Sequence, residues 1–406
     1  MRVLVACAAL AGALLPVSVG AQTLSLTELQ ALARFSIESP RVQAVRAAVD
    51  VAQAEVLAAG RWPNPRLTYN RESVAGISES MFLVSQVLPL TGRRSLDARA
   101  ASQRVDAVSR RVDDEVRRLR ADLRLAFTDL WTAQASEREL VRSRDRLRDL
   151  AEVLGRREAA GDAAGFDRLR ADREAIEVEA DRAAAATLRA RAQAMLVSFF
   201  PSMPEGAVET VTTERQVPVL PPLEDLIVRA EGVRPNLLAL GHELEAAALA
   251  ERAAGRRAVP EPELVVGTKS SNAGTGDVGT MVSVHVSVPL FDRSRPERAA
   301  AVARAAQVRA ETAQLRLALR SQIAGWYDAL VARRDSAASY RVAVTANAEQ
   351  IERIALVSYE AGERGILELL DAYRVGASAR VRQITLDAAA REAEVELEYV
   401  SGWEIP

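Results

Sequence analysis

Three acidic residues, Asp167, Glu368 and Asp371, follow shortly after two glycines, Gly161 and Gly362. Counted from these glycines, Asp167 and Glu368 occupy equivalent places at the start of a predicted helix, and Asp371 comes three residues after Glu368. Residues three apart lie on the same face of a helix, so Glu368 and Asp371 can act together. Repeated around a threefold axis, these carboxylates would form rings that attract cations. The expected chemistry is therefore electrostatic attraction of cations.

Residue types that perform catalysis or hold cofactors are sparse in this chain. His242 and His285 are far apart and lack the spacing of metal ligands. The segment 274–276 precedes no Lys-Ser/Thr pair and opens no predicted helix, so it does not form a phosphate-binding loop. The single cysteine, Cys7, lies in an apolar leader segment. We predict no enzyme activity, no catalytic residue, no metal site and no cofactor.

The candidate carboxylates belong to the two halves of a duplicated sequence. The segment that begins at Pro40 is echoed from Pro235, and Glu158–Arg173 is echoed by Tyr359–Arg374. The repeated unit is far longer than one unit of a solenoid, so a whole structural half is made twice. The predicted segments are a signal peptide at 1–21, a first repeat at 22–200, a linker at 201–222 and a second repeat at 223–401.

The N-terminal segment has the features of a secretory signal. Arg2 supplies the positive charge, Val3–Val19 is mostly apolar, and small residues precede a cleavage site between Ala21 and Gln22. Cys7 resembles the cysteine of a lipid-attachment motif, but too little apolar sequence precedes it. No later segment reaches the ~18–20 apolar residues of a transmembrane helix. An exported chain of this kind is soluble in the periplasm, secreted, or part of an outer-membrane β-barrel.

The composition favours long amphipathic helices over nucleic-acid binding. Aromatic residues make up only 4% of the chain, and 53 basic residues nearly balance 55 acidic ones. The arginines alternate with acids along predicted helices instead of clustering, which is typical of a solvated helix face. We therefore predict no nucleic-acid partner.

Two long helical hairpins should position the candidate carboxylates. Apolar residues step by threes and fours from Val105 to Leu130, and the pattern returns from Leu315 to Leu330. This predicts long hairpins at 92–199 and 292–400, with the two glycines at their tips. Returning helices should begin near Phe166 and Ile366. Shorter helices are predicted over Ser25–Arg34 and Pro40–Gly60.

Each hairpin is preceded by two short extended runs. The predicted strands are 66–72 and 81–88 in the first half, and 263–269 and 280–288 in the second. Ser73–Ser80 and Ser270–Gly279 should form the connecting turns. Alternating valines from Val282 to Val288 oppose Ser283 and His285, which predicts a lipid-facing side and a lumen-facing side.

Four strands cannot close a barrel, because an open sheet would leave unpaired backbone groups at its edges in lipid. Closed bacterial barrels have even strand numbers of at least eight. A closed barrel therefore needs more than one copy of the chain, and three copies would supply twelve strands.

Four ordered motifs connect these features to a known family. They are Trp62–Pro65, Ser85–Arg94, Val288–Arg295 and Tyr359–Ala372. With them the chain resembles the TolC-like outer membrane efflux proteins, and among these the cobalt–zinc–cadmium resistance outer-membrane factors, from Gln22 to about Val400.

The resemblance implies a mainly α fold with a small β part, the TolC-like duplicated fold. A trimeric, twelve-stranded β-barrel in the outer membrane of a Gram-negative bacterium would continue as a twelve-helix α-barrel through the periplasm. The implied partners are outer-membrane lipid, a periplasmic adaptor protein and an inner-membrane transporter of the heavy-metal RND type. The implied function is a passive exit duct.

The resemblance also assigns roles at the hairpin tips. Gly161 and Gly362 would dock the adaptor. Tyr359 and Arg364 match positions that close the periplasmic gate through hydrogen bonds and ion pairs, with Asp167 as acceptor.

Two alternatives stay open at this point. A soluble periplasmic coiled-coil adaptor would have one helical hairpin inside nested β domains, whereas this chain has two hairpins in tandem. A duct for drugs or for type I secretion of a polypeptide would share every feature described, because the sequence distinguishes poorly among cargoes.

Overall fold

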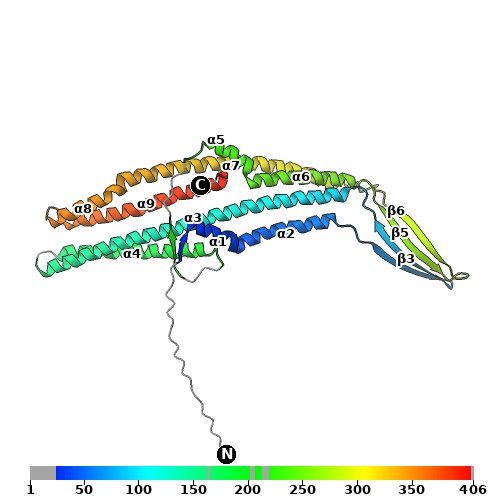
Figure 1. Cartoon of the computed structure of the whole chain (residues 1–406), viewed down its shortest axis with the longest axis horizontal. Helices are drawn as coiled ribbons and strands as arrows, with labels where there is room; N and C mark the ends of the chain where they lie inside the picture. The colour runs from blue at the N-terminus through cyan, green and yellow to red at the C-terminus, as the bar shows by residue number, and fades with distance from the viewer. Residues whose placement is uncertain (1–23, 162–164, 202–205, 213–218, 404–406) are drawn as a thin grey trace, which may run out of the picture.

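The computed structural model describes residues 24–161, 165–201, 206–212 and 219–403. The molecule is elongated, with long helices running side by side and a small sheet projecting from one end (Figure 1). The hairpin tips lie at the opposite end from the sheet, as Figure 1 also shows. The gate candidates and the sheet are therefore separated by the full length of the helices.

The two halves repeat one order of elements, apart from a π-helix in the second. The first half consists of β1 (Leu24–Thr27), α1 (Glu28–Glu38), α2 (Pro40–Gly60), β2 (Arg66–Val74), β3 (Ile77–Val87), α3 (Arg93–Ala159) and α4 (Gly165–Val197). The second half consists of β4 (Val208–Val211), α5 (Leu223–Val233), α6 (Pro235–Arg256), β5 (Pro262–Ser271), β6 (Val278–Val286), α7 (Arg295–Tyr340), the π-helix η1 (Arg341–Thr345), α8 (Ala346–Glu360) and α9 (Ile366–Ser401).

Local sequence explains several helix boundaries. Thr27 and Gln30 form a capping box, in which each side chain bonds the other's backbone N–H, so α1 begins at Glu28. Pro40 and Pro235 stand in the first turns of α2 and α6, where the missing N–H costs nothing. The 67 residues of α3 contain no proline, and at ~1.5 Å per residue they extend ~100 Å.

The start of the predicted helix at Ser25–Arg34 is wrong, because Leu24–Thr27 forms β1 instead. This strand pairs in parallel with β4, which lies within the predicted linker at 201–222. Leu26 and Val208 are both buried there, so each strand contributes an apolar side chain to the same core. The pairing joins segments that no local pattern connects.

The larger sheet is antiparallel with the strand order β2-β3-β5-β6. The turn predicted over Ser73–Ser80 is mostly strand, because Ala75 and Gly76 alone reverse the chain, with φ angles of 50° and 83°. Consequently β3 begins at Ile77 and not at residue 81. Similarly, β6 begins two residues earlier than predicted and ends at Val286.

One face of the sheet is mostly apolar and exposed, whereas the other mixes polar side chains with Met81, Leu83 and Val265. Leu67, Val84, Val266 and Val282 pair in register across all four strands, and all four side chains are exposed. The opposite face carries a 2.6 Å ion pair between Lys269 and Glu79 and the partly buried Ser283. An exposed apolar face backed by a more polar one is the pattern of a lipid-facing sheet.

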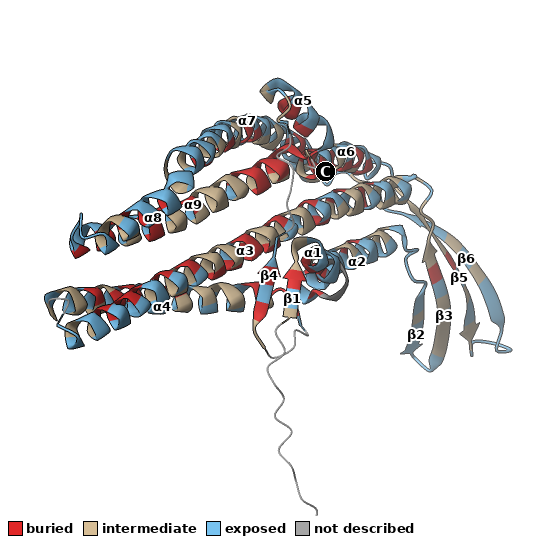
Figure 2. Ribbon diagram, turned by 60° about the vertical axis from the view of Figure 1, so that its left-hand side comes forward, coloured by how far each residue is buried: buried red, intermediate tan, exposed pale blue. Residues whose placement is uncertain are grey.

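Three apolar cores hold the helices together, and Figure 2 shows the buried residues on the facing sides of the helices. One core unites α1, α3 and α4 with β1 and β4 around Phe35 and Leu123. A second unites α5, α7 and α9 around Ile323 and Leu397. The third lies near the hairpin tips and is shared by both halves.

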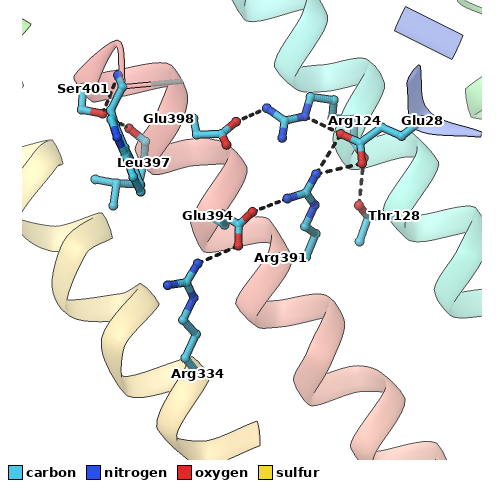
Figure 3. Close-up of polar contacts among 10 residues, drawn as sticks. Glu28, Arg124, Thr128, Arg334, Arg391, Glu394, Leu397, Glu398 and Ser401 are labelled. Carbon is cyan, nitrogen blue, oxygen red and sulfur yellow. Dashed lines mark hydrogen bonds and ion pairs between the residues drawn. The ribbon is translucent and has the colours of Figure 1, made fainter. Parts of the chain in front are cut away.

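An ion-pair cluster joins the two halves midway along the molecule (Figure 3). Arg391 of α9 donates to both carboxylate oxygens of Glu28 at 2.8 Å, and Arg124 of α3 donates to Glu28 at 2.6 Å. Arg124 also pairs with Glu398 of α9. We refer to Glu28, Arg124, Arg391 and Glu398 as the central joint.

Candidate functional site at the hairpin tips

Each hairpin turns at a glycine whose backbone other residues rarely adopt. Gly161 has φ 82° and Gly362 has φ 73°, and the left-handed region is strained for residues with a Cβ atom. At the second tip, the N–H groups of Glu363 and Arg364 both donate to the carbonyl of Ser358, at 2.9 and 3.2 Å. The second turn is therefore tight and fixes where α9 begins.

The third core supports both tips at once. Its buried side chains come from α3, α4, α8 and α9, and include Leu154, Ala171, Ala355 and Leu369. The partly buried Tyr359 packs against the same core. The two tips are therefore held at a fixed separation within one protomer.

Tyr359 and Asp167, which are 192 residues apart in sequence, meet at this place. The Tyr359 hydroxyl donates to Oδ2 of Asp167 at 3.4 Å, which links the end of α8 to the start of α4. Burial raises the pKa of Tyr359, the charge of Asp167 adds to the shift, and Arg157 opposes it. The phenol therefore remains a donor at neutral pH.

The other gate candidates lie outside this contact. Glu368 is exposed, and Asp371 pairs with Arg374 one turn later at 2.7 Å. Arg364 is exposed and forms no ion pair with Asp167 among the described residues, so the expected Arg364–Asp167 pair does not form within one protomer. The structure thus brings Tyr359 to Asp167 and leaves the remaining three side chains facing solvent.

Sequence reasoning missed the ion pairs that flank the site. Arg168 donates to Glu158 at 2.6 Å and to Asp172 at 3.0 Å, so it ties α3 to α4 just above the tip. The four-residue spacing of Arg168 and Asp172 could have indicated half of this arrangement. Nothing in the sequence indicates the contact between Glu158 and Arg168 or the approach of Arg157 to Tyr359.

Among the described residues, no three His, Cys, Asp or Glu side chains are arranged to hold a metal ion. His242 Nδ1 lies 2.8 Å from the Gln103 side chain, and His285 is exposed on the sheet. Within the same residues, no helix is both long and apolar enough to cross a bilayer. The predicted cleavage site at Ala21 and Gln22 lies outside the residues that the structure describes.

Residues 226–402 match the family described as outer membrane efflux protein. The chain is 23% identical over 358 residues to the cobalt-zinc-cadmium resistance protein CzcC of Cupriavidus metallidurans, covering 87% of this chain and 84% of that protein.

Solved structures share the fold across nearly the whole chain. A structure of CusC superposes with a TM-score of 0.75 at 16% identity, covering 93% of this chain and 92% of CusC. The outer membrane protein VceC of Vibrio cholerae superposes with a TM-score of 0.74 at 17% identity, covering 92% of this chain and 96% of VceC. The fold is therefore that of the TolC-like channels.

Proposed function

We propose that this chain belongs to the outer membrane efflux protein family, whose model matches residues 226–402, and that it is the exit duct of a tripartite pump. Its place is the outer membrane of a Gram-negative bacterium. Substrate would pass through it passively from the periplasm to the exterior. The energy would come from an inner-membrane transporter that is coupled to the duct by a periplasmic adaptor.

The single observation that carries this proposal is the four-stranded sheet joined to two tandem hairpins. One face of the sheet is apolar and exposed, and β2 and β6 each have a strand partner on only one side. Unpaired strand edges are costly in lipid, so further strands must complete the sheet. Three copies would provide twelve strands and a ring of hairpins below them.

In this assembly the hairpin tips would form the periplasmic gate. The Tyr359–Asp167 bond would hold α8 against α4, and Arg364 would reach a carboxylate of a neighbouring copy. Glu368 and Asp371 would form acidic rings around the pore. Gly161 and Gly362 would shape the surfaces that dock the adaptor, because both stand at the extreme ends of the hairpins.

The cargo we propose is a divalent metal ion, since CzcC is named for cobalt, zinc and cadmium resistance. The acidic rings favour cations over anions, which agrees with this cargo. A duct for drugs is the second candidate, because the hairpin architecture is equally suited to it.

Single-channel recording tests the gate. The double variant Tyr359→Phe/Arg364→Ser should conduct more than the wild type in planar bilayers, because both substitutions remove contacts that close the pore. A matched control, Tyr340→Phe/Arg309→Ser, changes the same residue types on α7, away from the tips, and should leave conductance unchanged. Glu368→Ala/Asp371→Ala should reduce cation preference and weaken block by divalent ions.

Two results would contradict the proposal. A purified protein that behaves as a water-soluble monomer by mass measurement would exclude the duct. Wild-type conductance and selectivity in every tip variant would exclude the gate.

A further inference from the structure

A hollow of about 480 Å³ lies where the sheet meets the helices, remote from the hairpin tips. It is lined by the end of α2, the segment Trp62–Asn64 and the start of α3. Three arginines line it, Arg61, Arg93 and Arg94. Its volume lies in the range of small-ligand sites, ~300–1,000 Å³.

The hollow lies beside the end of β3, where Val87 lines it, and the preceding residue of the strand belongs to the apolar face of the sheet. Gln86 stands on that face, in line with Phe82 and Val84, because alternate residues of a strand point the same way. The Gln86 amide donates to the carbonyl of Pro63 at 3.0 Å. Trp62 and Pro63 therefore lie on the side of the sheet that would meet lipid.

Exposed apolar side chains also occur in the segments that connect the sheet to the helices, where the hollow lies. Trp62 is 60% exposed and Phe291 is fully exposed, and Leu90 and Leu290 are exposed beside them. Aromatic side chains concentrate where the hydrocarbon of a membrane meets its headgroups. The hollow therefore lies at headgroup depth, on the side of the sheet nearest the periplasmic helices.

The charge of this region is positive although the chain as a whole carries −2. Segments 60–66 and 88–97 contain four arginines and one acidic residue, Asp97. The other acid of the hollow, Glu261, is compensated by Arg93 at 3.6 Å and by the Thr91 hydroxyl at 2.6 Å. The positive charges of Arg61 and Arg94 therefore exceed the remaining negative charge.

Two contacts fix the position of the Arg94 side chain. Its guanidinium lies 5.3 Å from the centre of the Trp62 ring and donates to the carbonyl of Gly60. A guanidinium has five N–H donors in a planar fork, so one bond to Gly60 leaves others for a ligand. Arg61 is exposed at the rim of the same hollow.

From these contacts we propose that the hollow binds the headgroup of an anionic glycerophospholipid from the periplasm-facing leaflet. Arg61 and Arg94 contact the phosphate, because guanidinium groups match phosphate oxygens in bidentate geometry. Trp62 and Leu90 pack against the upper part of the acyl chains. This inference rests on the proposed position of the sheet in the membrane.

Native mass spectrometry of the full-length protein in detergent tests the site. We expect the wild type to retain phosphatidylglycerol about tenfold more strongly than phosphatidylcholine, because the choline cation of phosphatidylcholine offsets the phosphate charge and is repelled by the two arginines. Arg61→Gln and Arg94→Gln should each weaken this preference, and the double variant should abolish it. Arg173→Gln, which removes an exposed arginine from α4, should leave it intact.

Several outcomes would overturn the proposal. Equal retention of both lipids by the wild type would exclude an anionic headgroup. Displacement of the lipid preference by millimolar inorganic phosphate would indicate a site for free phosphate. Loss of oligomer stability in lipid-free detergent by Arg61→Gln, with lipid retention unchanged, would show that the hollow seats a neighbouring copy. Channel conductance is recorded separately, so failure of the duct function is distinguishable.

Discussion

Buried charge near the hairpin tips depends on one glycine. The Glu352 carboxylate of α8 is only 6% exposed and pairs with Arg146 of α3 at 2.7 Å and with Arg380 of α9 at 2.8 Å. Gly376 of α9 faces it so closely that an added Cβ would lie 2.8 Å from the Glu352 Cδ atom. Glycine is needed here because of space, not because of its backbone angles.

Gly376→Ala should therefore displace Glu352 from its arginines. Removing one partner from a buried ion pair costs about 3–5 kcal/mol, and partial displacement should cost somewhat less, ~2–3 kcal/mol. The expected result is a lower midpoint of thermal unfolding. Gly325→Ala provides the matched control, because the position is helical, exposed and faces open space. That change should be neutral or stabilising by up to ~1 kcal/mol. Equal midpoints for both variants would contradict the explanation.

At the scale of elements, the second hairpin differs from the first by the π-helix η1. Gln383 of α9 donates to the carbonyl of Ala337 at 3.1 Å and accepts from Thr345 at 3.3 Å, so it bridges the last turn of α7 and the end of η1. Asp387, one turn later, accepts from Arg341 at 2.6 Å. Figure 2 shows the chain changing direction between α7 and α8. A π-helix of this kind interrupts the α-helical register and often marks a functional bend.

Gln383→Leu should loosen this bend. The side chain is buried, and its amide donates to both the Ala337 carbonyl and the Asp387 carboxylate, which keep only their bonds from Arg341 when it is lost, at a cost of about 1 kcal/mol. Hydrogen exchange should accelerate in 337–346 and remain unchanged in α4. Thr385→Ala is the control, since Thr385 is exposed two residues away on the same helix. Protection of 337–346 at the wild-type level would show that Gln383 does not hold η1.

Helices whose ends are marked by proline or glycine in the local sequence could be predicted. Pro40 and the break at Trp62–Pro65 gave the bounds of α2, and the absence of proline indicated α3. The pairing of β1 with β4 could not be predicted, because it depends on residues 24 and 208 meeting in the folded chain. The π-helix was missed for the same reason, since Gln383 lies on another helix. The Tyr359–Asp167 contact was expected from family resemblance alone.

At the scale of the whole molecule, the central joint fastens the N-terminal helix to the last one. Glu28 receives bonds from Arg124 and Arg391, and Arg124 also pairs with Glu398 (Figure 3). Because α3 belongs to the first half and α9 to the second, these pairs connect the two repeats. The central joint lies between the sheet and the hairpin tips. A movement of one repeat against the other at the gate would therefore stretch its ion pairs.

Acid should weaken the central joint. Burial acts to raise the pKa of Glu28, but Arg391 and Arg124 outweigh it and hold the pKa below its ordinary value. A carboxyl group whose pKa is lower in the folded state stabilises the fold above its unfolded pKa of ~4.3, and this stabilisation is lost as the pH falls through the folded value. The midpoint temperature of wild-type unfolding should therefore decrease once the pH is below about 5.

Glu28→Gln should lower the midpoint temperature at pH 7. Its midpoint should decrease less on acidification than that of the wild type, because the variant has no carboxylate at position 28 to neutralise. Glu349→Gln, which alters an exposed residue of α8, should keep the wild-type profile. Parallel curves for the wild type and Glu28→Gln between pH 7 and pH 3 would show that Glu28 does not couple acid to stability.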